Sequence, residues 1–537
     1  MINPDKIWLK RSVAMKLPEL SKRNYKLFLC TAALLLIATA ALRHAGAEEA
    51  ARLILTPKPG PAPTINGPKV YGARPGHPFL YRIPCTGVRP IRFSAEGLPS
   101  SLHLDDSTGI ISGEVPERRG EYAITFHASN QKGSSSRPFK LVVGDALALT
   151  PPMGWNDWYT YYDRITDEVV RQAADAMISS GMADFGYQYV DIDDCWMRKP
   201  GAKDPLLGGV QRGPEGAILS NGRFPDMNGL TAYIHARGLR AGIYTGPGPL
   251  TCGRFTASYK HEQVDAQQFA NWGFDFLKYD WCSYGEVAPH KTVEDFQRPY
   301  RLMGGILTKL NRDVVFNMCQ YGMGDVWNWG ADVNGHLWRT TGDLGATKGK
   351  QLPGFYEIGF ANAEHFAAAG PGHWNDPDYI LIGYVGNAFH DQDAPTLTPL
   401  TPNEQYSYMS MWSLMASPLF YSGDMSHLDA FTLNVLCNSE VIDIDQDALG
   451  KQAGIVRHNA NEFVLSKPLE DGALAVGLFN LAGVKAKLTV KWDELGLKGR
   501  FRIRDVWRQK DIGDAAEEFS TEVGPHGVAL IHLARAD

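Results

Sequence analysis

Three stretches of this chain differ in how hydrophobic and polar residues follow one another. From about residue 69 to 147, short runs such as 79–83, 110–113 and 122–126 alternate with a period of two and are separated by turn residues. That alternation is typical of strands with one buried face. Closely spaced strands, following a linker rich in Pro and Gly at 57–68, predict a β-sandwich over residues 48–147.

The central stretch, residues 148–452, contains apolar runs that alternate with helical patterns. Helical periodicity occurs at 167–180 and 264–272, for example. The eight apolar runs in some 300 residues predict a (β/α)₈ barrel, with a doubly wound open sheet as the alternative. The runs are 153–156, 187–192, 239–244, 274–279, 314–318, 336–340, 373–375 and 418–421.

The last stretch, residues 453–537, returns to alternation at 463–465, 474–478 and 528–531. This pattern predicts a second, antiparallel β-sandwich. The expected fold is therefore multidomain, with a (β/α)₈ barrel between an N-terminal and a C-terminal β-sandwich.

Residues 1–47 have the pattern of a signal peptide. Basic residues precede an apolar run at 27–42, and Ala45-Gly46-Ala47 then supplies small residues for cleavage. We therefore expect export to the periplasm or outside the cell, with no stable membrane insertion after processing. A retained anchor is the alternative, and the long basic region leaves Met15 as a second candidate start.

Charge and cysteine content indicate which kinds of ligand the chain does not bind. The 53 Lys and Arg residues face 59 Asp and Glu, and no basic block follows the signal region, so we expect no nucleic-acid partner. Six of the seven cysteines follow residue 47, and none forms a CxxC or Cys/His cluster with zinc spacing. We predict no metal and no cofactor.

Carboxylates end several of the predicted barrel strands. Asp193 and Asp194 follow the second run, Asp280 follows the fourth, and Asp343 follows the sixth. Catalytic groups of such barrels collect at the carboxyl ends of strands, and a pair of carboxylates is what glycoside hydrolysis requires. Lys278 lies two residues before Asp280, so on a strand the two side chains point to the same side. We therefore expect the ammonium group of Lys278 to keep Asp280 ionised.

Five motifs in order resemble the family-27 glycoside hydrolases, the α-galactosidase (melibiase) family. The likeness runs from about residue 149 to the C-terminus, and segment 97–113 resembles immunoglobulin-like modules of exported bacterial enzymes. The motifs are Met153-Gly154-Trp155-Asn156-Asp157-Trp158, Asp193-Asp194-Cys195-Trp196, Lys278-Tyr279-Asp280-Trp281-Cys282, Trp338-Arg339-Thr340-Thr341-Gly342-Asp343 and Trp374-Asn375-Asp376-Pro377-Asp378.

The resemblance implies a retaining exo-α-galactosidase in which Asp280 is the nucleophile and Asp343 the general acid/base. It also implies a disulfide between Cys252 and Cys282 beside the nucleophile. The implied galactose-binding residues are Asp193 and Asp194 for the 4- and 6-hydroxyls, Lys278 for the 3- and 4-hydroxyls, Arg339 for the 2-hydroxyl, Asp378 near the reacting centre, and Trp158 and Tyr244 as apolar walls.

Two positions depart from the family pattern. Gln320 and Tyr321 follow Cys319 where relatives commonly have Glu-Trp, so Gln320 is expected to bind the 2-hydroxyl without a charge. Tyr379 replaces a usual Met, which could reshape the rim of the site. The preference at the sugar's 2-position is therefore open.

Three alternatives remain: a β-L-arabinopyranosidase, an α-N-acetylgalactosaminidase, or a carbohydrate-binding protein without activity. The expected substrate is an oligosaccharide or polysaccharide that carries α-galactosyl groups. The sequence specifies neither the aglycone nor the oligomeric state.

Overall fold

The fold comes from a computed structural model that describes residues 53–288, 290–344, 352–386 and 394–536. The predicted signal peptide lies outside these residues. Leu55–Asp537 forms one compact unit, which carries the three predicted domains. No helix in the described ranges is long and apolar enough to cross a membrane.

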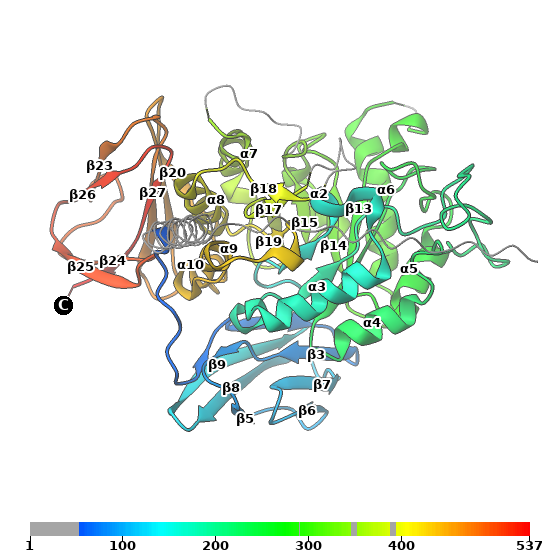
Figure 1. The fold of residues 1–537 in the computed structure, drawn as a ribbon, viewed down its shortest axis with the longest axis horizontal. Coiled ribbons are helices and arrows are strands. Elements are labelled where there is room, and N and C mark those ends of the chain that lie inside the picture. Colours follow the sequence, from blue (N-terminus) through cyan, green and yellow to red (C-terminus); the bar gives the residue numbers. More distant parts are fainter. Residues whose placement is uncertain (1–52, 289, 345–351, 387–393, 537) are drawn as a thin grey trace, which may run out of the picture. The chain divides into compact units, whose positions relative to one another are not determined.

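The first domain is the predicted β-sandwich (Figure 1). One sheet has the order β2-β9-β8-β5 and the other β3-β7-β6, with a short β1-β4 pair beside them. Rings from both sheets meet between them: the centroid of Phe139 lies 4.7 Å from that of Phe126 and 5.0 Å from that of Tyr81. The strands are β1 (Thr64–Ile65), β2 (Val70–Ala73), β3 (Pro78–Arg82), β4 (Cys85–Thr86), β5 (Arg92–Glu96), β6 (Leu102–Leu104), β7 (Ile110–Glu114), β8 (Gly120–Asn130) and β9 (Gly133–Val143).

The second domain is a parallel barrel, and each of its eight strands overlaps one of the predicted runs. The sheet order is β16-β15-β14-β13-β12-β11-β10-β19, and a parallel bridge from Ile380 to Tyr421 joins the two ends. The alternative of an open, doubly wound sheet is wrong. The strands are β10 (Met153–Asn156), β11 (Tyr189–Asp191), β12 (Arg240–Thr245), β13 (Phe276–Asp280), β14 (Val315–Cys319), β15 (Leu337–Arg339), β16 (Trp374–Asp376) and β19 (Leu419–Tyr421).

Helices follow the barrel strands, and local sequence explains where they begin. Helix α3 buries Val170, Ala173, Ala174 and Met177, which lie on one helical face. Capping boxes start α6 at Thr292 and α8 at Thr401. The main helices are α2 (Trp158–Tyr161), α3 (Asp167–Ser179), α4 (Met227–His235), α5 (Glu262–Trp272), α6 (Val293–Leu307), α7 (Gly354–Ala363), α8 (Pro402–Leu414), α9 (Ala430–Leu436) and α10 (Ser439–Asp445).

The third domain is the predicted antiparallel sandwich. A sheet of order β20-β21-β22-β27-β24-β25 packs against the β23-β26 pair through Leu478, Val490 and Val523. The strands are β20 (Gly454–His458), β21 (Glu462–Pro468), β22 (Leu474–Asn480), β23 (Ala486–Lys491), β24 (Phe501–Asp505), β25 (Lys510–Ala515), β26 (Glu518–Val523) and β27 (Val528–Arg535). The proposed domain boundaries at 147/148 and 452/453 stay predictions.

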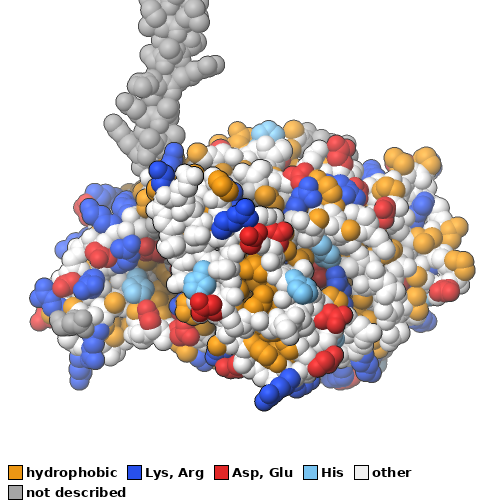
Figure 2. All heavy atoms as spheres, turned by 90° about the horizontal axis from the view of Figure 1, so that it is seen from below, with side chains coloured by type: hydrophobic (Ala, Val, Ile, Leu, Met, Phe, Trp, Pro, Cys, Tyr) orange, Lys and Arg blue, Asp and Glu red, His pale blue; other side chains and the backbone are white. Residues whose placement is uncertain are grey.

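Charge is dispersed over the described surface that is visible in one view. In Figure 2 the basic and acidic side chains are interspersed across the face shown. An extended basic stripe is the usual footprint of a nucleic-acid site, and this face does not carry one among its described residues.

Buried polar contacts join the first sandwich to the barrel. Asp313, which precedes β14, accepts a hydrogen bond from the backbone N–H of Arg74 at 3.0 Å. Its other oxygen lies 2.8 Å from Nδ1 of His77. Arg240, at the start of β12, donates to the carbonyl oxygen of Leu80 at 2.7 Å. The sandwich therefore supports the ends of the barrel strands opposite the carboxyl ends.

We expect Asp313→Ala to lower the free energy of unfolding by about 1–3 kcal/mol, because a buried N–H and a ring nitrogen would lose their partner. The thermal midpoint of the full chain measures this. Asp332→Ala is the matched control, since Asp332 is exposed. Equal midpoints for the two variants would contradict a supporting role for Asp313.

Candidate active site

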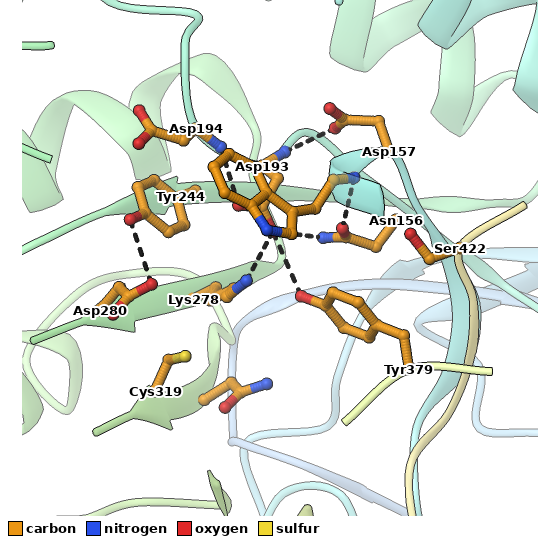
Figure 3. A network of polar contacts seen from close by, with 12 residues as sticks. Asn156, Asp157, Asp193, Asp194, Tyr244, Lys278, Asp280, Cys319, Tyr379 and Ser422 are labelled. Carbon is orange, nitrogen blue, oxygen red and sulfur yellow. Dashed lines mark hydrogen bonds and ion pairs between the residues drawn. The ribbon is translucent and has the colours of Figure 1, made fainter. Parts of the chain in front are cut away.

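The carboxyl ends of neighbouring barrel strands bring together several of the predicted site residues, among them Asp193, Lys278 and Asp280 (Figure 3). Asn156 ends β10, Asp193 and Asp194 follow β11, and Tyr244 lies in β12. Lys278 and Asp280 lie in β13, Cys319 ends β14, and Arg339 ends β15. Because all strands are parallel, these ends share one rim of the barrel.

Asp193 is the centre of a polar network. Its Oδ2 accepts hydrogen bonds from Nδ2 of Asn156 at 2.8 Å, from Nζ of Lys278 at 2.7 Å and from the Tyr379 hydroxyl at 3.2 Å (Figure 3). Nζ of Lys278 also lies 5.0–6.0 Å from the ring centroids of Tyr379, Tyr244 and Trp158. Burial lowers the pKa of Lys278, but the adjacent Asp193 carboxylate outweighs burial and raises this pKa well above its usual value, so Lys278 stays charged. The aromatic faces stabilise the ammonium group further.

Asp194 is held by backbone donors. The N–H of Gly253 donates to Oδ2 at 2.7 Å, and the N–H of Cys195 donates to Oδ1 at 2.6 Å. A Cβ at position 253 would lie 2.9 Å from Sγ of Cys195 and 3.1 Å from Oδ2 of Asp194, so only glycine permits this approach. Burial outweighs these hydrogen bonds and raises the pKa of Asp194 to about 7.

Asp280 is buried between two tyrosines. The Tyr244 hydroxyl donates to Oδ2 at 3.2 Å, and the Tyr321 hydroxyl donates to Oδ1 at 2.5 Å. Burial raises the pKa of Asp280 to about 6, opposed by the charge of Lys278 and the hydrogen bond from Tyr321. Lys278 thus favours ionised Asp280, as predicted, but its direct partner is Asp193. Asp280 is ionised at neutral pH and becomes protonated as the pH falls through about 6.

Arg339 joins two carboxylates on the other side of the site. Its Nη2 lies 3.1 Å from Oδ1 of Asp343 and 3.1 Å from Oδ2 of Asp378. The side chain of Asp378 is fully buried and also accepts a hydrogen bond from the Tyr159 hydroxyl at 2.7 Å. The side chain of Asp343 is 28% exposed, so of these two carboxylates it is the one that water reaches.

Gln320 has an unusual environment. Its side chain is fully buried, and neither Oε1 nor Nε2 has a hydrogen-bond partner within the described parts of the chain. Buried amides are nearly always hydrogen-bonded in native proteins. A hydroxyl-bearing ligand is one way to supply the missing partner.

Cys252 and Cys282 form the implied disulfide. With Asp280 they make a group whose possible ligand atoms lie within 4.8 Å of one another. Because the two sulfurs are bonded to each other, they are not thiolates, which are the sulfur ligands that metals take.

Comparison with known families decides the affiliation. A family model described as "Alpha galactosidase A" matches residues 150–447, more than half of the chain. The chain belongs to the α-galactosidase family. The model "Alpha galactosidase C-terminal beta sandwich domain" matches residues 463–533, and "Putative Ig domain" matches residues 62–144. The predicted family and fold class are confirmed.

Relatives from distant organisms share this family. A "Probable alpha-galactosidase" of Dictyostelium discoideum is 35% identical over 72% of this chain and 94% of its own length. A crystal structure titled "putative alpha-galactosidase/melibiase" from Bacteroides fragilis is 34% identical, has a TM-score of 0.80, and covers 90% of this chain and 99% of that chain. An α-galactosidase of Saccharomyces cerevisiae, solved with raffinose, is 25% identical, with a TM-score of 0.63 and coverages of 73% and 98%.

Sequence reasoning missed several members of this α-galactosidase-family site. Asn156 lies inside the first motif, and its position at the end of a strand was a signal for it. Tyr159 and Gly253 left no comparable signal. Tyr379 was expected to shape the rim, but it is 5% exposed and donates to Asp193 within the network.

Proposed function

We propose that this chain is a retaining exo-α-galactosidase that removes terminal α-D-galactosyl groups by double displacement. The observation that carries the proposal is the pair Asp280, which ends β13, and Asp343, which follows β15, on one rim of the barrel and in unlike environments. One carboxylate is buried between two phenols, and the other is partly open to water. Retaining hydrolysis needs one carboxylate as the nucleophile and a second as the general acid and base.

In the first step, ionised Asp280 attacks the anomeric carbon and the bond to the leaving oxygen breaks. Asp343 gives its proton to that oxygen, and a galactosyl ester of Asp280 forms. In the second step, Asp343 takes a proton from water, and the water oxygen attacks the anomeric carbon. Asp280 leaves as a carboxylate, and galactose is released with its α configuration retained.

Polar side chains of the site would orient the sugar. Asp193 and Asp194 accept from the 4- and 6-hydroxyls, Lys278 donates to the 3- and 4-hydroxyls, and Arg339 reaches the 2-hydroxyl. Gln320, whose amide atoms have no hydrogen-bond partner among the described residues, supplies a neutral group for the same 2-hydroxyl. Trp158 and Tyr244 provide the apolar faces on which sugar rings stack, and Asp378 holds Arg339 in place.

The natural substrate in this proposal is an oligosaccharide or polysaccharide with terminal α-galactosyl groups, met after export through the signal peptide. Product analysis tests the assignment: an aryl α-galactoside should be cleaved, and α-galactose should appear first in the NMR spectrum. Faster cleavage of an aryl β-L-arabinopyranoside or α-N-acetylgalactosaminide would favour those activities. No turnover of any of them would indicate a carbohydrate-binding protein.

We expect Asp193→Ile to shift the preference from α-galactoside toward β-L-arabinopyranoside, which lacks the 6-hydroxymethyl group. A site built to pair a hydroxyl can discriminate by up to about 10⁴-fold against an analogue without it. Both substrates suffer equally from the broken ion pair with Lys278, so the ratio of the two kcat/KM values isolates the 6-hydroxyl. An unchanged ratio would remove Asp193 from this role, and Asp332→Ile serves as the exposed control.

A further inference from the structure

Tyr321 occupies a special position just after β14. Its backbone is left-handed, with φ of 64°, and Gly322 follows with φ of 83°. A left-handed conformation is unfavourable for a bulky residue and persists only where the surroundings enforce it. A Cβ on Gly322 would collide with the carbonyl oxygen of Thr340. This turn lets Tyr321 reach Asp280 on the neighbouring strand.

Two groups constrain the Tyr321 hydroxyl. It lies 2.5 Å from Oδ1 of Asp280, and it lies 3.6 Å and 3.7 Å from Sγ of Cys282 and Cys252. Because the disulfide is covalently closed, it forms a fixed wall beside the phenol. Among the residues that the structure describes, the strong acceptor of this hydroxyl is therefore the Asp280 carboxylate.

The two oxygens of Asp280 have different donors. Tyr321 binds Oδ1, while Tyr244 binds Oδ2 at the longer distance of 3.2 Å. Both hydrogen bonds go to the same ionised carboxylate, and charge-assisted hydrogen bonds of this kind are short and strong. Of the two, the contact from Tyr321 has the short distance of such a bond, so we assign it the larger contribution to holding the carboxylate.

We propose that Tyr321 is a positioning residue that orients Asp280 and stabilises its ionised form. The role rests on the proposed function, in which Asp280 is the nucleophile. The hydrogen bond is strongest when Asp280 carries its charge, before attack and after release of the sugar, and weakens in the ester. Tyr321 therefore keeps the nucleophile ionised and makes the carboxylate a better leaving group in the second step.

Other groups also act on Asp280, and the test must separate them from Tyr321. Lys278 lowers its pKa, whereas Asp343 and Asp193 raise it. The remaining titratable neighbours are Tyr244 from β12, Cys319 from β14 and Tyr300 from α6. A Tyr321→Phe substitution changes none of these groups and removes only the hydroxyl of residue 321.

The experiment measures kcat/KM for an aryl α-galactoside against pH with the full chain. Because kcat/KM reports the free enzyme, loss of the hydrogen bond in Tyr321→Phe should move the acid limb upward by about one pH unit. The fall in activity should therefore be greatest below pH 7, and the galactosyl ester should accumulate as a burst of aglycone. Tyr233→Phe, which breaks a 2.7 Å phenol–carboxylate bond to Asp175 on the outer helices, should leave the limb in place.

A second variant protects the test against misfolding. 3-Fluorotyrosine at position 321 keeps the ring and has a more acidic phenol, so the acid limb should move downward. If both variants are active and the acid limb of their pH profiles stays in place, the role of Tyr321 is overturned while the proposed function stands. A wild-type chain that does not cleave α-galactosides would overturn the proposed function and this role together.

Discussion

Asp280→Ala should abolish turnover, with a loss on the order of 10⁴- to 10⁶-fold, and azide should restore part of it. The substitution removes the nucleophile but leaves space beside Tyr244 and Tyr321, whose hydroxyls bind the carboxylate oxygens in the wild type. A small anion fits this space and attacks from the same face as the lost carboxylate. The product is then a β-galactosyl azide, because one displacement inverts the anomeric centre.

The stereochemistry of the azide product distinguishes the two carboxylates. In Asp343→Ala the ester with Asp280 still forms, so azide attacks that ester and yields an α-galactosyl azide. The anomeric configuration of each azide product, measured by NMR, identifies which residue is the nucleophile and which is the acid/base. Wild-type activity in Asp280→Ala, or an α-azide from it, would contradict the assignment of Asp280 as nucleophile.

Asp343→Ala should slow hydrolysis of substrates with poor leaving groups by about 10²- to 10⁴-fold. The leaving oxygen of a sugar needs a proton in the transition state, whereas an activated nitrophenolate does not. The first step with an activated aryl galactoside should therefore be nearly unaffected. Comparing kcat/KM for a nitrophenyl galactoside and an α-galactosyl disaccharide measures the difference.

Equal losses on both substrates would show that Asp343 is not the acid. Asp378→Asn is the matched comparison, because Asp378 also contacts Arg339 but is fully buried. Asp378→Asn should lower kcat/KM for both substrates by the same factor, since Asp378 acts through the position of Arg339. The contrast between the two variants separates proton transfer from orientation of the sugar.

Much of the architecture could be predicted because it depends on local patterns. The apolar runs that became β10 through β16 and β19 were visible as such, since strands buried on both faces have few polar residues. The position of Asp280 and Asp343 at strand ends also followed, because parallel strands place their carboxyl ends on one rim. The five motifs then indicated the family, which the match over residues 150–447 confirmed.

Local sequence determined the strands, the helix starts and the choice of residues at the strand ends. Only the tertiary structure decided their pairings: Lys278 bonds to Asp193, which is 85 residues away, and Tyr321 bonds to Asp280 across 41 residues. The sequence likewise did not predict that Asp313 joins the first sandwich to the barrel, because its partner Arg74 is 239 residues away. Hydrophobic periodicity specifies which face of an element is buried, but the partner of a buried polar group depends on which elements the fold brings together.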